Sequence, residues 1–199
     1  MKTRAKKSRE LQKRQALLEE GRTQGLAHGL SSLSVEQVAA NADISKRTLY
    51  KYFGSRDAFI AAIIAFDGDT WREWFFDAIR EQADAPLKRL LVFFETLAMW
   101  TASSDFQGCL FAQVLCCKAV FSEDTIRAAQ EQMAYVSKFL QDHAQKAGVR
   151  NPPHFAASLL PSTMLLLSGA SSLVVDNPGQ HLATMAHTLL HNDIGLETL

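Results

Sequence analysis

The apolar residues of this chain recur at helical spacing almost throughout, and no stretch alternates between apolar and polar residues as a half-buried strand does. Five prolines and ten glycines divide the 199 residues into segments of helix length. Hydrophobic residues make up 47% of the chain, which is enough apolar surface to bury a core and argues against wholesale disorder. We therefore expect an all-α fold of about nine helices.

Caps and prolines predict where most of these helices begin. Serine favours the N-cap position, and Ser34 is followed three residues later by Gln37, as in a capping box. Proline favours the first helical position. On these grounds we expect helices over about 9–28, after Ser34, from Ser45, from Ser55 to Ala83, after Pro86, across Phe111–Val120, after Ser122, after Pro152-Pro153 and after Pro178.

The net charge of zero conceals an uneven distribution. Residues 1–66 carry 12 basic and 6 acidic side chains, whereas residues 67–199 carry 9 and 15. Such an asymmetry indicates an anionic partner for the first segment. Residues 1–8 are basic and polar, and we interpret them as a flexible arm that either contacts phosphates or is simply solvated.

Several classes of protein are disfavoured by what the sequence contains. Its apolar runs are too short for a membrane span, and the basic N-terminus is not followed by the apolar region of a secretory signal. Three cysteines, two of them adjacent at Cys116 and Cys117, do not make a disulfide framework and fit a reducing cytoplasm. His187 and His191 have metal-ligand spacing without a third ligand nearby, so we expect no metal site and no cofactor. The sequence also has no Ser-His-Asp string and no paired-carboxylate motif, so we expect no enzyme.

Two short helices joined only by Asp43 and Ile44 have the connection of a helix-turn-helix. In the second helix, Leu49 and Phe53 lie four residues apart and are expected to pack inward. The other side chains of the segment are cationic or carry hydroxyls, and they suit a DNA major groove lined by phosphates and base edges. Short basic helices are also common outside DNA-binding proteins, so spacing and charge alone leave both interpretations open.

The segment from Ser34 to Asp57, SVEQVAANADISKRTLYKYFGSRD, resembles the N-terminal signature of the TetR family of transcriptional repressors. That signature reads approximately S-V-x-x-I-A-x-x-A-G-V-S-x-x-T-L-Y-x-Y-F-x-S-K-E. The chain departs from it at Asp43, where Gly is usual, and Asp tolerates the same turn. Gly21 and Gly25 stand where the family usually has Ala and an aromatic residue, so the first helix is expected to bend or fray there.

The resemblance implies a DNA-binding domain over residues 1–66, with the helix-turn-helix at about 34–53. It implies phosphate contacts for Ser34 and Tyr52, a backbone contact for Arg56, and base reading by Lys46, Arg47 and Tyr50. Arg47 is the best candidate for a bidentate contact to guanine. The predicted DNA-binding residues are Ser34, Ser45, Lys46, Arg47, Thr48, Tyr50, Lys51, Tyr52 and Arg56.

For residues 67–199 the resemblance implies a helical regulatory domain with a ligand cavity and a dimer interface. The helix expected after Pro152-Pro153 is apolar nearly all round from Leu159 to Val175, and small residues at Ser168–Ser172 permit a close helix crossing. We therefore expect a homodimer through this eighth helix and the ninth, which follows Pro178. An ordinary monomer core is the alternative. The predicted pocket residues, which also fit a plain core, are Trp71, Trp74, Phe75, Trp100, Cys109 and Phe111.

Two smaller predictions concern titratable groups. The string Gly108–Phe111 resembles a Gly-Cys-x-Phe element that opens a helix beside the cavity in some members of the family. Cys109 is then either a thiol of lowered pKa that senses oxidants or electrophiles, or a small buried thiol. Asp67 and Asp69 are interpreted as solvated or helix-terminal charges.

The sequence as a whole predicts a cytoplasmic, ligand-responsive repressor that binds a palindromic operator and is released by an unknown small effector. A helical enzyme and an adaptor for acidic proteins are the rival functions.

Overall fold

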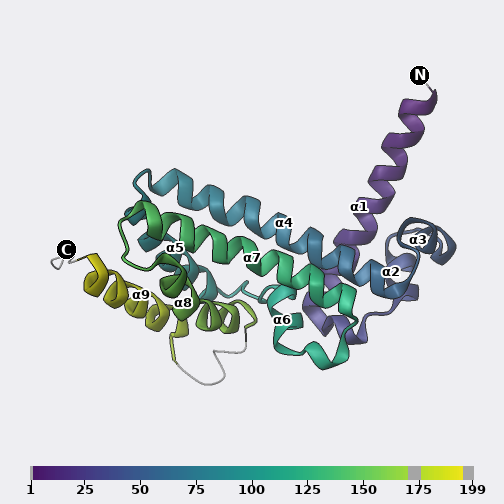
Figure 1. Ribbon diagram of the computed structural model, residues 1–199. Helices are drawn as coiled ribbons and strands as arrows, with labels where there is room; N and C mark the ends of the chain where they lie inside the picture. The colour runs from purple at the N-terminus through teal and green to yellow at the C-terminus, as the bar shows by residue number, and fades with distance from the viewer. Residues whose placement is uncertain (1, 170–175, 195–199) are drawn as a thin grey trace.

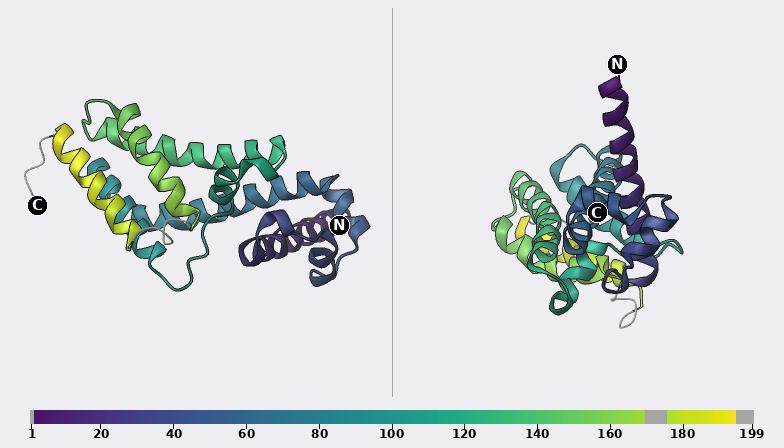
Figure 2. Two further views of the ribbon diagram at one scale, coloured as in Figure 1. Left: turned by 90° about the horizontal axis from the view of Figure 1, so that it is seen from below. Right: turned by 90° about the vertical axis from the view of Figure 1, so that its right-hand side faces the viewer.

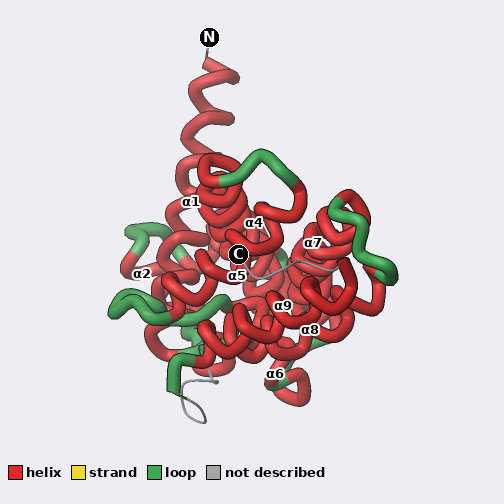
Figure 3. Tube along the Cα trace, turned by 90° about the vertical axis from the view of Figure 1, so that its left-hand side faces the viewer, coloured by secondary structure: helices red, strands yellow, loops and turns green. Residues whose placement is uncertain are grey.

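The structure of the protein, a computed structural model, describes residues 2–169 and 176–194, with side chains described from residue 6 onward. Within these residues the chain forms nine α-helices and two short 3-10 helices and no strand (Figure 1, Figure 3), which confirms the predicted all-α fold. In chain order the elements are α1 Lys2–His28, η1 Leu30–Ser32, α2 Val35–Asn41, α3 Lys46–Phe53, α4 Arg56–Gln82, α5 Pro86–Thr101, α6 Leu110–Cys116, η2 Lys118–Val120, α7 Glu123–Lys146, α8 Pro152–Leu167 and α9 Pro178–Ile194.

Serine hydroxyls cap four of these helices. The N–H of the residue three positions on donates to the hydroxyl oxygen of Ser34, Ser45, Ser55 and Ser122, over 3.2, 3.2, 3.0 and 3.4 Å respectively. Each such cap contributes about 1 kcal/mol. The predicted helix starts are therefore confirmed, but the capping box is not, because the Gln37 amide donates to the Asn41 side chain at 2.8 Å instead of reaching back to Ser34.

Helix α1 differs from its prediction in two respects. It already includes residues 2–8, which we had assigned to an arm, and it passes through Gly21 and Gly25 without a break. Both glycines are buried, and a Cβ atom at Gly21 would lie 2.5 Å from Ile63 Cδ1 of α4. A Cβ atom at Gly25 would lie 2.7 Å from Leu30 Cδ2 of η1. The glycines therefore serve close packing rather than a bend.

Substitution of Gly21 by Ala is expected to destabilise the protein, although Ala is the better helix former by about 1 kcal/mol. Overpacking against Ile63 costs about 1–3 kcal/mol and outweighs that gain. Urea denaturation measures the difference. Thr23→Ala, at an exposed position of the same helix, gains helix propensity without a clash and is expected to be neutral or slightly stabilising; equal stability changes in the two variants would contradict the packing role of Gly21.

Two further helices end earlier than expected. Helix α6 ends at Cys116 and is followed by the 3-10 turn η2, so the predicted single helix to Val120 is wrong in its last part. Helix α8 ends at Leu167, where Ser168 adopts the C-cap and Gly169 has a φ of 81°, a value that favours glycine. The rest of the predicted apolar stretch, residues 170–175, lies outside the described residues.

Helix α4 joins two parts of an elongated molecule. Helices α1 to α3 pack around its N-terminal half, and α5 to α9 form a helical body around its C-terminal half (Figure 1, Figure 2). Its fully buried side chains include Phe59 and Ile63 in the first half and Phe75 and Ile79 in the second. Because α4 runs unbroken past residue 66, any tilt of this helix changes how the N-terminal helices are held relative to the body.

Candidate nucleic-acid interface

The turn between α2 and α3 is tight and internally hydrogen-bonded. The Asp43 N–H donates to the Ala40 carbonyl at 3.1 Å, and the Ile44 N–H donates to the Ala39 carbonyl at 2.9 Å. Asp43 adopts a left-handed φ of 53°, so the expectation that Asp tolerates this turn is confirmed. Ile44 is buried beside the turn and fixes the approach of the two helices.

Helix α3 has two distinct faces. Leu49 is fully buried, and the half-buried Phe53 packs on Phe59 of α4 with 4.7 Å between the ring centroids, as the spacing predicted. On the opposite side, Lys46, Arg47 and Lys51 are exposed. The buried face anchors the helix to the protein, which leaves the cationic face available to a partner.

The three exposed cations of α3 differ in their surroundings. Within the described part of the chain, the side chains of Arg47 and Lys51 form no hydrogen bond or ion pair. Lys46 forms an ion pair with Glu36 of α2, and its ammonium lies 5.8 Å from the centre of the Tyr50 ring. The hydrogen bond from the Lys46 ammonium to the Glu36 carboxylate lowers the pKa of Glu36. Both side chains are exposed to solvent, and exposed ion pairs contribute little stability. A phosphate can therefore replace Glu36 as the partner of Lys46 at small cost.

Hydroxyl groups surround these cations. Ser34 and Ser45 accept backbone N–H groups as caps, and each hydroxyl also carries a proton of its own to donate. Thr48 lies 2.9 Å from the Ser45 hydroxyl, oxygen to oxygen. Tyr52 is half-buried, with its ring edge-on to Phe53 at 6.5 Å. The segment thus combines cations and hydroxyl donors, the two kinds of group that bind phosphate oxygens and base-edge acceptors.

Arg56 has a role that the sequence did not predict. Its Nε and Nη2 atoms donate to the Leu33 carbonyl at 3.3 and 3.2 Å, and Nη2 also donates to the carbonyls of Leu30 and Ser31 at 3.3 and 3.0 Å. The guanidinium thereby satisfies the carbonyls of the loop that leads into Ser34. Arg56 positions the N-cap of α2, and its predicted contact to a DNA backbone remains a prediction.

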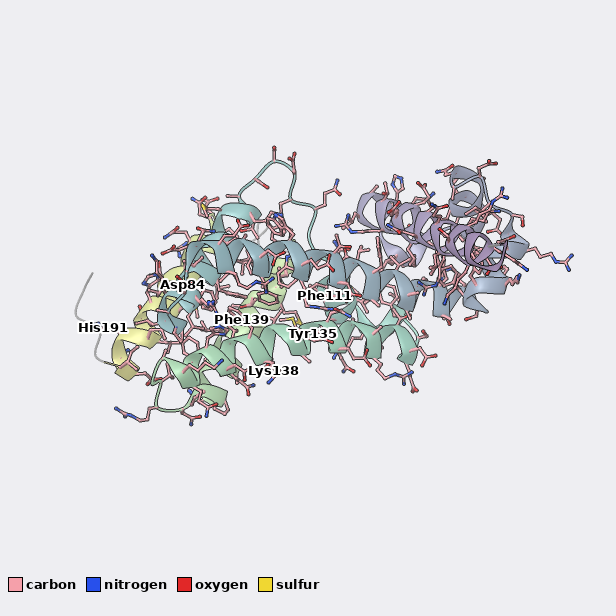
Figure 4. All side chains as sticks on the ribbon, turned by 90° about the horizontal axis from the view of Figure 1, so that it is seen from above. Asp84, Phe111, Tyr135, Lys138, Phe139 and His191 are labelled. Atoms are coloured by element: carbon pink, nitrogen blue, oxygen red, sulfur yellow. The ribbon has the colours of Figure 1, made fainter. Side chains whose placement is uncertain are left out.

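The predicted pocket residues of the body come together as an aromatic cluster, which we define as Trp71, Trp74, Phe75, Trp100 and Phe111. Trp71 lies at its centre, with its ring centroid 4.7 Å from that of Phe75, 5.7 Å from Phe111 and 6.2 Å from Trp100. The rings pack against one another, and Figure 4 shows Phe111 inside the body, whereas Lys138 points outward from α7. The Trp71 indole N–H is buried and has no hydrogen-bond partner among the described residues.

A separate groove of about 700 Å³ lies between α6, α7 and α8. Its apolar lining includes Leu115, Met133, Leu160 and Met164, and Lys118 lies at its edge. None of the six residues predicted to form the pocket lines this groove. The aromatic cluster and the groove are therefore two different features of the body.

Cys109 is a thiol that the structure buries away from solvent. It is 2% exposed, and burial together with the negative charge of Asp67 raises its pKa well above the ordinary value. The sensing hypothesis required a lowered pKa and access to solvent, and the structure contradicts both. The helix N-terminus that was expected to stabilise a thiolate already receives the Asp67 carboxylate, which accepts the N–H of Leu110.

Thiol reactivity tests this assignment. Cys116 and Cys117 are exposed, so we expect two thiols to react rapidly with 5,5′-dithiobis(2-nitrobenzoate) in the native protein and the third only after urea unfolding. Cys109→Ala is the control and should release two equivalents in both states. A rapid third equivalent from the native wild-type protein would contradict the burial of Cys109.

Of the two interpretations of Asp67, a solvated or a helix-terminal charge, the structure contradicts the first. It is 1% exposed and accepts a hydrogen bond from Arg22 Nε at 2.8 Å and from the Leu110 N–H at 3.0 Å. Burial raises the pKa of Asp67, although the Arg22 charge and both hydrogen bonds oppose that rise. Asp69, two residues on, is exposed and pairs with Arg72 as expected of a surface charge. The sequence carried no signal for Asp67, because its partners lie 45 and 43 positions away.

The described residues hold no helix long and apolar enough to cross a membrane. Over the same residues, no group of three His, Cys, Asp or Glu side chains has the arrangement of a metal site.

Comparison with known proteins agrees with this geometry. Residues 17–63 match the family model described as bacterial regulatory proteins, tetR family. That range contains α2, the turn and α3 together with the segments of α1 and α4 that pack on them. No curated protein matches the chain by sequence.

Solved structures share the fold over nearly the whole chain. A putative TetR transcriptional regulator from Streptomyces avermitilis has a TM-score of 0.78 at 23% identity, covering 91% of this chain and 97% of that one. A TetR-family regulator from Streptomyces coelicolor has a TM-score of 0.75 at 17% identity, covering 91% and 95%.

The regulator AibR, solved in complex with isovaleryl coenzyme A and operator DNA, has a TM-score of 0.63 at 17% identity, covering 89% and 98%. The matched N-terminal segment, its helix-turn-helix geometry and the shared all-helical fold lead to one conclusion: residues 17–63 form a helix-turn-helix domain of the tetR family, within a chain that has the fold of TetR-family regulators.

Proposed function

We propose that this protein binds an operator sequence through the exposed face of α3. The observation that carries the proposal is the pair of cations, Arg47 and Lys51, which point away from the protein on a helix whose opposite face is anchored by the buried Leu49. Desolvated or unpaired charges are costly inside a protein, but on a surface they remain available for an anionic partner. Helix α3 is two turns long and fits a major groove.

The individual residues have distinct expected roles. Arg47 is proposed to read guanine by a bidentate contact, since its guanidinium is exposed and uncommitted. Lys46 precedes it at the start of α3 and Tyr50 lies one helical turn further on, and both would approach neighbouring base edges. The remaining proposed contacts are to phosphates and involve Ser34, Ser45, Thr48, Lys51, Tyr52 and Arg56. Arg56 would use Nη1, because its Nε and Nη2 atoms donate to the loop before α2.

A homodimer through α8 and α9 would present two α3 helices to one duplex. The two helices leave large apolar side chains exposed, Leu165 on α8 at 44% and Met185 on α9 at 46%. Pairing with a second copy would cover both, as in a four-helix bundle. A twofold dimer places its recognition helices about one DNA turn apart and selects a palindromic site.

We further propose that the protein represses transcription and is released by a small effector bound at the aromatic cluster. Support comes from the Trp71 indole N–H, since a buried donor without an acceptor costs about 1–3 kcal/mol. A flat ligand with a hydrogen-bond acceptor, inserted beside Trp71, would satisfy that donor. Trp74, which is 48% exposed, is the member of the cluster that an effector would meet first. The AibR structure shows a regulator of this fold with both a ligand and DNA.

Binding to DNA at several salt concentrations tests the proposed function against its rivals. Fluorescence anisotropy with a mixed-sequence duplex should show an affinity that falls linearly with salt on logarithmic axes, because phosphate contacts release counterions. Light scattering at micromolar concentration should give the mass of a dimer. An absence of DNA binding at low salt would favour the adaptor for acidic proteins, and a monomer mass would contradict the α8–α9 interface.

A further inference from the structure

We propose that Asp67 is a joint that couples the first turn of α6 to the orientation of the DNA-binding helices. This inference rests on the proposed function, since it concerns how the body controls DNA binding. It assigns a positioning role to three groups, the carboxylate of Asp67, the guanidinium of Arg22 and the backbone N–H of Leu110.

The two oxygens of the Asp67 carboxylate serve two different elements. Oδ1 accepts from Arg22 Nε of α1 at 2.8 Å, and Oδ2 accepts from the Leu110 N–H at the start of α6 at 3.0 Å. The carboxylate itself belongs to α4 and is almost fully buried. Helices α1 and α6 therefore each bond to a single charged group of α4, which lies between them.

A buried carboxylate does not tolerate the loss of its partners. An ionised group inside a protein is stable only when it is paired and hydrogen-bonded, and removing one partner leaves an uncompensated charge. If the Leu110 N–H moves away, the Asp67 carboxylate loses one hydrogen bond and must change its conformation to replace it. Arg22, which is bonded to the same carboxylate, must then move as well. We therefore expect the joint to exist in discrete hydrogen-bonded arrangements and not to deform gradually. A coupling element needs such discrete states.

The α6 side of the joint lies next to the proposed effector site. Phe111 immediately follows Leu110, and Trp71 lies one helical turn after Asp67 on α4. The rings of Phe111 and Trp71 are 5.7 Å apart. A ligand that separates these two rings would shift the first turn of α6 relative to α4, and the same movement would pull the Leu110 N–H from Asp67.

The first turn of α6 has a second attachment in the body. The Cys109 N–H donates to the Leu167 carbonyl at the end of α8 over 2.7 Å. A Cβ atom at Gly108, whose φ is 82°, would lie 2.9 Å from the Ser168 carbonyl oxygen, so only glycine permits this approach. The turn is therefore tied to α8 on one side and to the Asp67 joint on the other.

The α1 side of the joint leads to the DNA-binding helices. Two residues before Arg22, the carboxylate of Glu20 accepts a hydrogen bond from the Asn41 amide of α2 at 2.7 Å. Leu17 and Leu18 of the same helix are buried in the core that holds α2 and α3. A change at Arg22 therefore acts on the helix that supports α2, and in a dimer it would change the separation of the two α3 helices.

The test compares stability with the spacing preference for DNA. Arg22→Met/Asp67→Asn replaces the charged pair with neutral groups and should unfold in urea near the wild-type midpoint. The DNA affinity of the double variant and of the wild-type protein is then measured on a single half-site and on inverted repeats whose spacing increases stepwise. We expect single half-site affinity to be retained, while affinity for the preferred spacing falls by about 5- to 150-fold, the usual range of allosteric coupling. A purely structural pair would leave the spacing preference unchanged.

The α6 arm of the joint has its own matched pair of variants. Leu110 is the first residue of α6, where proline is tolerated, so Leu110→Pro removes the N–H that Asp67 accepts without breaking the helix. Leu110→Ala loses similar packing but keeps the N–H. We expect the proline variant to lose spacing preference and the alanine variant to retain it, each compared at temperatures where both are folded.

Two controls complete the design. Arg22→Lys keeps the cation and should retain the spacing preference, and Arg127→Met removes an exposed ion pair of α7 that has no link to the joint. A wild-type spacing preference in the double variant or in Leu110→Pro would overturn the coupling role of Asp67 while leaving the proposed function intact. A wild-type protein that binds no DNA would overturn the proposed function and, with it, this inference.

Discussion

Arg47→Ala is expected to weaken binding to the selected operator by about 1–3 kcal/mol at each half-site, and to relax the base preference at one position of that half-site. The guanidinium lies exposed on α3 without a partner in the described chain, so its removal takes nothing from the folded protein. The stability in urea should therefore stay within about 0.5 kcal/mol of wild type. Competition binding against operators with single substitutions measures both effects.

A matched control separates base reading from simple attraction. Lys51→Ala removes a second uncommitted cation from the same helix. As a phosphate contact it should weaken binding to all sequences alike and reduce the salt dependence by about one charge per half-site. Unchanged base preference in Arg47→Ala would contradict the base-reading role, and a changed preference in Lys51→Ala would contradict the division of labour between the two residues.

Leu49→Ala is expected to have the largest effect on the fold of the DNA-binding part. Leu49 is fully buried and is the main anchor of α3, so truncation should cost about 2–5 kcal/mol through lost burial and the cavity left behind. Affinity for the operator should fall as well, because a loosened α3 no longer presents its cationic face at a fixed angle. Urea denaturation followed by tyrosine and far-ultraviolet signals measures the first effect, and anisotropy measures the second.

Leu49→Met is the corresponding control. It nearly conserves side-chain volume and should cost less than about 1.5 kcal/mol. Equal stability of the Ala variant and wild type would show that Leu49 does not anchor α3. Normal operator affinity in a strongly destabilised Ala variant would show that the anchoring of α3 is unimportant for binding.

The parts of the fold that were predictable are those determined by neighbours in sequence. Serine caps, prolines at helix starts and the inward spacing of Leu49 and Phe53 all act within one or two helical turns, and the structure confirms them. The same holds for the turn at Asp43. Local chemistry of this kind leaves a readable pattern because its partners are only a few residues apart.

The features that escaped prediction depend on contacts between distant segments. Gly21 was expected to bend or fray a helix, but a Cβ atom there would meet Ile63 of α4. Asp67 was interpreted as a solvated or helix-terminal charge, but its two oxygens accept hydrogen bonds from Arg22 and from the Leu110 N–H. Arg56 likewise donates to the Ser31 carbonyl in the segment before α2, a contact between residues 25 positions apart. Nothing in the spacing of these residues reports a neighbour 23 to 45 positions away.

Cys109 shows how a correct local premise led to a wrong conclusion. It stands at the N-cap of α6, as expected, but a helix N-terminus lowers a thiol pKa only where the thiolate is solvated or paired. Full burial beside a carboxylate reverses the direction of the shift. The predicted aromatic residues did come together, but in the described structure they pack against one another around Trp71.

Selection of binding sites from random-sequence duplex DNA tests most directly the central claim that α3 reads an operator as part of a twofold dimer. We predict enrichment of an inverted repeat whose half-sites are centred about one helical turn apart, with a guanine whose enrichment disappears in Arg47→Ala. Recovery of unenriched DNA, or of a motif that Arg47→Ala selects equally well, would contradict the claim.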